Sequence, residues 1–73
     1  MNAKDAVAIR IKELCDVHNT NINELAHNIN VTPSTIYSMT NSKSMNPGVV
    51  SIQKICNGLG ISLKEFFNSP LFD

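Results

Sequence analysis

Residues 21–41, which read NINELAHNINVTPSTIYSMTN, decide the fold of this chain. In the first part of the stretch, apolar side chains recur with the spacing of one helix face, at Ile22, Leu25, Ala26 and Ile29. Asn21 precedes them and Glu24 follows three residues later, a spacing typical of a capping box. In a capping box the side-chain oxygen of Asn21 accepts a hydrogen bond from a backbone N–H at the start of the helix, and the Glu24 carboxylate accepts one from the backbone N–H of Asn21. A short helix is therefore predicted to begin after Asn21 and to end at Asn30, because asparagine tolerates the left-handed conformation.

A second helix is predicted over residues 33–41. Thr32 is a suitable N-terminal cap, and Pro33 at the first helical position loses no bond through its missing N–H. Ile36 and Met39 point the same way at about 100° per residue. Four polar residues cluster on the opposite side: Ser34, Tyr37, Ser38 and Asn41. The helix is thus expected to be anchored narrowly and to present a polar, uncharged outer face.

A longer helix is predicted ahead of this stretch, over residues 4–18. The apolar spacing places five residues on its buried face: Val7, Ile11, Leu14, Cys15 and His18. Ile9 points the other way and is expected to be exposed. Cys15 and the distant Cys56 both fall on apolar helix faces of a chain with no signal peptide, so we expect buried, inert thiols rather than a disulfide.

Two shorter helices are predicted after residue 41. The first begins at Val49, beyond a loop over residues 42–48, and is stopped by Gly58 and Gly60. Its apolar face comprises Val49, Ile52, Ile55, Cys56 and Leu59. Ser62 and Glu65 form a second capping box, which opens a brief helix that carries Leu63, Phe66 and Phe67. The prediction is an all-α, compact bundle of about five short helices, a single domain over residues 1–73 with an apolar tail at 68–73.

Composition limits the class of protein. With 73 residues, 42% of them hydrophobic and 16% charged, the chain is too apolar to be disordered and too short for a second domain. No apolar run is long enough to cross a bilayer, so a cytoplasmic protein is expected. Net charge is zero, but residues 25–64 contain no acid while Lys43, Lys54 and Lys64 are present. By itself, zero net charge argues against a polyanion-binding domain, because such domains usually carry a basic excess. The central residues nevertheless carry a small positive surplus, for which chance in a lightly charged chain is the alternative explanation.

Neither a metal site nor an active site is predicted. Cys15, His18 and His27 could form one corner of a metal site, but no second pair of ligands accompanies them. The two histidines also have no plausible nucleophile or carboxylate partner, and there is no glycine-rich phosphate loop. We therefore expect no enzyme activity, no cofactor and no small-molecule ligand.

Helix, three-residue break and short helix form the helix-turn-helix motif, here over residues 21–41. Ala26 is small enough for the two helices to approach closely, and Val31 fills the turn. On this motif the sequence resembles the lambda repressor/Cro-type helix-turn-helix DNA-binding proteins. The resemblance covers nearly the whole chain and extends to Ile11 and Leu14, residues 24–26, residues 31–36, Asn46 and Pro47, Lys54 and Ile55, residues 59–63, and residues 65–67.

The resemblance implies that residues 33–41 form a recognition helix in the major groove of double-stranded DNA. By position, the base-reading residues are Pro33, Ser34, Tyr37 and Ser38. The positions that match contacts to the DNA backbone are Asn21, Ile22, Asn23, Thr32, Thr35, Asn41 and Lys43. The outward face found from helical periodicity agrees with this assignment.

Three departures from the family pattern bear on the strength of DNA binding rather than on the fold. Asn30 stands where the family often has glycine, and Ile22 stands where it often has glutamine. Cys15 and Thr40 replace an arginine–glutamate pair, and because both partners are absent together no buried charge is stranded. Without arginine or glutamine, the predicted reading face offers serine hydroxyls, which can bond to either donors or acceptors of the bases.

Two functions fit the sequence. The first is a sequence-specific DNA-binding regulator, a compact repressor or Cro-like protein that binds its operator as a homodimer, through the C-terminal helix and tail. The alternative is a protein-interaction module of the same fold, antitoxin-like or partner-binding. It is supported by Ile9, which is expected to be exposed, and by the apolar residues Leu71 and Phe72. Leu71 and Phe72 are expected to pack either on Phe66 and Phe67 or across a twofold axis.

Overall fold

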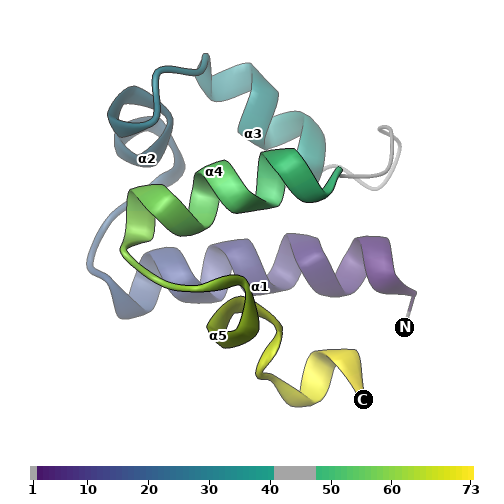
Figure 1. Ribbon diagram of the computed structural model, residues 1–73. Helices are drawn as coiled ribbons and strands as arrows, with labels where there is room; N and C mark the ends of the chain where they lie inside the picture. The colour runs from purple at the N-terminus through teal and green to yellow at the C-terminus, as the bar shows by residue number, and fades with distance from the viewer. Residues whose placement is uncertain (1, 41–47) are drawn as a thin grey trace.

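The computed structural model describes residues 2–40 and 48–73, without the side chains of Met39 and Thr40. Its elements are α1 (Ala3–Val17), α2 (Ile22–Asn28), α3 (Pro33–Thr40), α4 (Val49–Leu59), α5 (Leu63–Phe67) and the 3-10 turn η1 (Pro70–Phe72). Helix α3 packs on α1 and α2, α4 packs on α2 and α5, and η1 returns to α1. Helix α3 lies at one edge of the bundle and α5 at the opposite edge (Figure 1). The predicted all-α bundle of five helices is confirmed.

The predicted apolar stripes form one core. Its buried members are Val7, Ile11, Leu14, Cys15, Leu25, Ala26, Ile36, Ile52, Ile55, Cys56 and Phe66. The prediction of burial is wrong for two residues: His18 is exposed, and Val49 keeps 68% of its surface exposed. Both stand at helix ends, His18 as the C-cap of α1 and Val49 as the first residue of α4, where the neighbouring elements no longer cover the stripe. Ile9 is 40% exposed, as predicted.

The turn between α2 and α3 has the predicted form. Asn30 adopts the left-handed conformation with φ 58°. The Val31 N–H then donates to the Ala26 carbonyl at 3.0 Å, and the Val31 side chain packs against the core. Ala26 itself is fully buried. These contacts fix the direction in which the chain enters α3.

The two capping boxes form only in part. The Asn21 Oδ1 accepts from the Glu24 N–H at 2.9 Å, and the Ser62 Oγ accepts from the Glu65 N–H at 3.1 Å. Among the described residues, neither glutamate returns a bond, and both residues are exposed. At α3 the expected Thr32 cap is also different: the Thr35 N–H donates to the Thr32 carbonyl at 3.0 Å, and the Thr32 hydroxyl contacts other hydroxyls.

The tail packs within the chain. The Phe72 ring lies 4.9 Å from the Phe67 ring and 6.2 Å from the Phe66 ring, measured between centroids. Phe66 is fully buried and Leu71 is half-buried. Of the two arrangements that the sequence left open, the structure shows packing of the tail on Phe66 and Phe67.

Arg10 attaches the last helix to the first, a contact that sequence analysis missed. Its Nε donates to the Phe66 carbonyl at 2.7 Å and its Nη2 donates to the Glu65 carbonyl at 2.9 Å. Its Nη1 pairs with Glu13 on α1. Because α5 has only five residues, its terminal carbonyls have few partners within the helix, and the guanidinium supplies them.

Replacement of Arg10 by methionine should destabilise the protein by about 2–3 kcal/mol, because two carbonyls lose charge-assisted bonds while the apolar stem remains. Lys12→Met, at an exposed position of the same helix, is the control and should change the free energy of unfolding by less than about 0.5 kcal/mol. Urea unfolding followed by circular dichroism measures both. Equal urea midpoints for the two variants would show that the hydrogen bonds from Arg10 to α5 do not stabilise the protein.

The two cysteines are buried and free, as predicted. Burial raises the pKa of the Cys15 thiol, and the nearby Asp16 carboxylate adds to the effect. Burial also raises the pKa of the Cys56 thiol, partly opposed by a backbone hydrogen bond. In the folded protein both thiols therefore stay protonated to higher pH than in the unfolded chain.

Alkaline pH should weaken the fold through these thiols. Their contribution to stability is complete below the unfolded thiol pKa of about 8.5 and is lost as pH rises toward the raised folded pKa. Urea titrations at about pH 7 and pH 9.5 should show a fall in the free energy of unfolding, and Cys56→Ala should make that fall smaller. A fall of equal size in both proteins would contradict a role for Cys56.

Within the described part of the chain, no helix is both long enough and apolar enough to span a membrane.

Candidate nucleic-acid interface

One side of helix α3 packs into the core, and the other side is exposed. Ile36 is fully buried and anchors the helix in the core. The four predicted base-reading residues, Pro33, Ser34, Tyr37 and Ser38, are all exposed, and Tyr37 keeps 50% of its surface exposed. Because α3 lies at the edge of the bundle, this face is not covered by another described element (Figure 1). The structure thus gathers the four residues on one outward surface.

Hydroxyl groups gather where α3 begins. The Thr32 Oγ1 lies 3.0 Å from the Ser34 Oγ and 3.0 Å from the Thr35 Oγ1. All three residues are exposed. The first N–H groups of a helix lack partners within it and carry partial positive charge, so this end favours an anionic group such as a phosphate. The sequence predicted Thr32 and Thr35 as backbone contacts but did not show that Ser34 joins their hydroxyl cluster.

The start of α2 offers main-chain N–H groups rather than side chains. Asn21 is the N-cap, and its side chain is occupied by the Glu24 N–H. Ile22 packs its side chain against the core, so only its backbone can face a ligand. Asn23 is exposed. Two other predicted backbone contacts, Asn41 and Lys43, lie outside the described residues.

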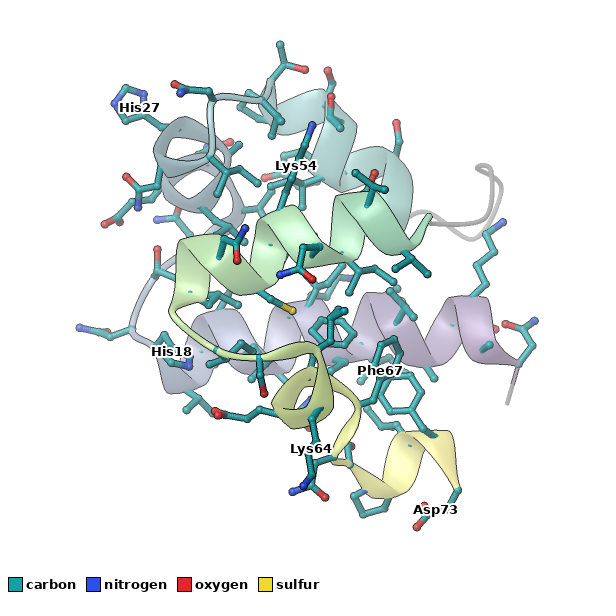
Figure 2. The ribbon with its side chains drawn as sticks, in the orientation of Figure 1. His18, His27, Lys54, Lys64, Phe67 and Asp73 are labelled. Atoms are coloured by element: carbon teal, nitrogen blue, oxygen red, sulfur yellow. The ribbon has the colours of Figure 1, made fainter. Side chains whose placement is uncertain are left out.

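The structure separates two lysines that the sequence could not distinguish. Lys54, on α4, lines a small cavity of about 50 Å³ together with Val31 and Thr35 of the helix-turn-helix motif. Figure 2 shows the Lys54 side chain pointing toward α3, whereas Lys64 lies on α5 at the opposite edge of the molecule. Helix α3 has no acidic residue in its first turn to repel a phosphate. Lys54 is therefore the better placed of the two to meet DNA bound along α3.

The suspected metal corner is not assembled. Cys15 is buried in the core, while His18 and His27 are exposed and stand at separate places on the surface (Figure 2). Across residues 2–40 and 48–73, no group of three or more His, Cys, Asp or Glu side chains is placed to hold a metal ion.

Known proteins share this architecture. The family model of the Cro/C1-type helix-turn-helix DNA-binding domain matches residues 10–70. Among solved structures, the chain is similar to the prophage Lp1 protein 11, with 30% identity over 99% of this chain and 95% of that chain and a TM-score of 0.88. A search of curated proteins finds no match. The chain belongs to the Cro/C1-type helix-turn-helix DNA-binding family.

Proposed function

We propose that this protein is a sequence-specific regulator of transcription, a repressor or Cro-like protein that places α3 in the major groove of an operator and acts as a homodimer. The observation that carries the proposal is the exposed, uncharged face of α3, opposite the buried anchor Ile36. Membership of a DNA-binding family supports it.

The chemistry of the face suits base reading by close fit. The hydroxyls of Ser34 and Ser38 can donate to or accept from base edges, and Tyr37 can touch a thymine methyl or a sugar. With its side chains an α-helix such as α3 is about 10–12 Å across, close to the roughly 12 Å width of the major groove. Such contacts carry little charge, so specificity in this proposal depends on how closely the helix approaches the bases.

Contacts to phosphates flank the reading face. The Thr32 and Thr35 hydroxyls stand at the start of α3, and the backbone at Asn21, Ile22 and Asn23 opens α2. Asn41 and Lys43 are assigned to phosphates from the sequence. Contacts of this kind set the position and register of a protein on DNA, while the base contacts set its sequence preference.

A protein-interaction module of the same fold is the second candidate. Ile9 and Val17 on α1 are large apolar side chains that are 40% and 72% exposed. The tail gives this candidate less support than the sequence suggested, because Phe72 packs within the chain. A chain that selects no duplex from a random library at low salt would favour this second function.

Ser34→Ala and Ser38→Ala should each change the base preference at particular operator positions and leave the fold intact, because both side chains are exposed. Each lost base contact should cost about 1–3 kcal/mol at its own base pair. Selection from a random duplex library, repeated with each variant, measures the change. Asn57→Ala, at an exposed uncharged position of α4, is the control. A double serine variant that selects the same sequences as the wild type would show that α3 does not read bases.

Lys54→Gln should weaken binding to every duplex by a similar factor and flatten the slope of log K against log salt by about one unit per bound copy. Lys64→Gln removes the same charge on the far side of the molecule and should leave the slope unchanged. For the wild-type dimer, two to three neutralised phosphates per copy give a slope of roughly −4 to −5. Equal flattening by the two variants, or a wild-type slope steeper than about −8, would contradict this docking.

A further inference from the structure

Asn57 and Gly58, near the end of α4, form a chemically labile pair. An asparagine side chain reacts with the backbone most readily when glycine follows it, because a residue without a Cβ lets its backbone nitrogen approach the side-chain carbonyl. No other asparagine of this chain is followed by glycine. Asn57 is also exposed, so water can reach its carboxamide.

The packing of α4 on α2 accounts for the glycine. A Cβ at position 58 would lie 2.4 Å from the Ile29 Cγ2 and 2.9 Å from the Leu25 Cδ1. Leu25 is buried in the core, and Ile29 packs against the core. A larger residue at position 58 would therefore displace the side chains through which α2 meets α4. The close approach of the two helices thus favours a labile residue pair at the surface.

The helix keeps the two reacting atoms of this pair apart. In an α-helix the Gly58 N–H donates to the carbonyl four residues earlier, and the reaction requires the backbone to leave the helical ψ of about −42°. The Gln53 Nε2 donates to the Asn57 Oδ1 at 3.2 Å and so holds the carboxamide toward the preceding turn. Gly60 ends the helix at φ 73°, and its N–H donates to the Asn57 carbonyl at 3.3 Å. Reaction therefore requires this last turn to open.

We propose that Asn57 is a site of spontaneous deamidation and that the last turn of α4, closed by Gly60, controls its rate. When the turn opens, the Gly58 backbone nitrogen attacks the side-chain carbonyl carbon of Asn57. A C–N bond forms, the bond to the side-chain nitrogen breaks, and ammonia leaves with the proton from the Gly58 N–H. Water then opens either carbonyl of the five-membered imide and gives aspartate or isoaspartate at position 57.

Both products disturb the support of the helix-turn-helix motif. A carboxylate at position 57 lies near the negative end of the α4 dipole, which disfavours it. Isoaspartate also adds a carbon to the backbone immediately before Gly58, where α4 approaches α2. The isoaspartate form should therefore unfold at a lower urea midpoint than the unreacted protein.

Peptide mass spectrometry of the full chain, incubated in mildly alkaline buffer, tests the proposal. The peptide that contains Asn57 should gain the mass difference between an amide and a carboxyl group, with release of ammonia. The folded protein should react at least about tenfold more slowly than the same chain in guanidinium chloride, because it reacts only from the open form. Asn57→Gln should abolish the signal, because its longer side chain does not form the five-membered ring.

Gly60→Ala should raise the rate in the folded protein by about 5- to 30-fold, because the left-handed conformation costs a residue other than glycine about 1–2 kcal/mol. A Cβ at Gly60 meets nothing within 4 Å, so the substitution acts through the backbone alone. Circular dichroism checks that the variant stays folded.

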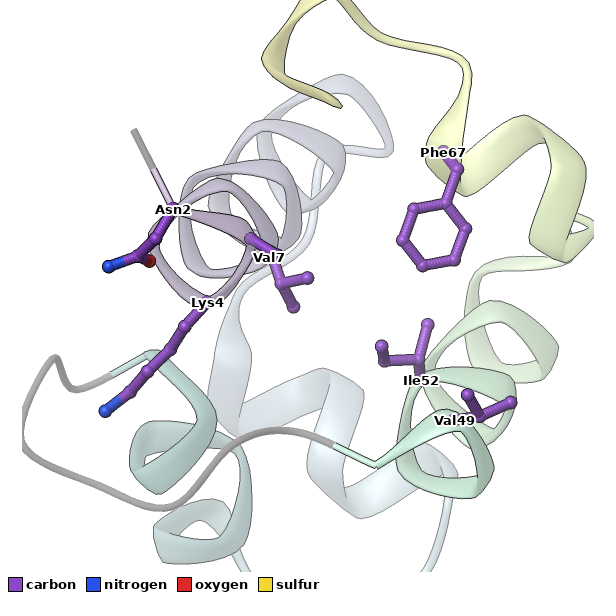
Figure 3. A pocket seen from close by; sticks show the side chains of 7 residues that line it. Asn2, Lys4, Val7, Val49, Ile52 and Phe67 are labelled. Atoms are coloured by element: carbon purple, nitrogen blue, oxygen red, sulfur yellow. The ribbon is translucent and has the colours of Figure 1, made fainter. Parts of the chain in front are cut away.

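Gly48→Ala is the matched control at the other end of α4, where φ is −82° and a Cβ likewise meets nothing within 4 Å. Gly48 precedes Val49, which borders an apolar groove of about 580 Å³ between α1, α4 and α5 (Figure 3). Fraying at this end is local, so the rate at Asn57 should stay within about twofold of the wild type.

A chain that gains no mass at Asn57 in guanidinium chloride would overturn the site. Equal rates in the folded and unfolded protein, or equal acceleration by Gly60→Ala and Gly48→Ala, would overturn control by the last turn of α4. Each of these results is obtained without DNA. Failure of the proposed function would appear instead as a chain that selects no duplex.

Discussion

The turn between α2 and α3 is the constraint on which the rest of this structure depends. An isolated helix of eight residues is unstable in water, so α3 takes its shape and direction from its attachments. Asn30 adopts the left-handed conformation and reverses the chain. The Val31 N–H donates a hydrogen bond to the Ala26 carbonyl and closes the turn, and the Ile36 side chain is buried in the core. With one side of α3 fixed in this way, its other side is left exposed at Ser34, Tyr37 and Ser38.

The remaining helices hold that unit in place. Helix α4 approaches α2 closely at Gly58, where a Cβ would lie 2.4 Å from the Ile29 Cγ2, so a side chain there would require Ile29 to shift. Arg10 binds two carbonyls of α5 and keeps the short last helix, and with it Phe66, on α1. A rigid support matters for a reading face made of hydroxyls, because such groups act only over hydrogen-bond distances, whereas lysine and arginine charges act over longer ones.

Local patterns predicted much of this arrangement. The stripe spacing identified the five helices, the buried thiols and Ile36, and the same periodicity placed Ser34, Tyr37 and Ser38 on an outward face. The predictions for His18 and Val49 were wrong because periodicity does not show where the neighbouring helices end. Arg10 and Phe66 are 56 residues apart in the sequence, so local patterns could not predict their contact. Lys54 and Lys64 carry the same charge, and their different surroundings depend on tertiary packing. The roles of the site residues in DNA binding, including those of Asn41 and Lys43, remain predictions.

The central claim is that the exposed face of α3 is the surface that meets DNA. A nuclear magnetic resonance titration of the labelled protein with a duplex of about 20 base pairs at low salt tests it most directly, since nonspecific binding uses the same electrostatic surface. The account predicts the largest amide shifts at residues 32–38 and at the start of α2, with α5 almost unchanged. Shifts confined to α5 and the start of α1, or no shifts at all, would contradict it.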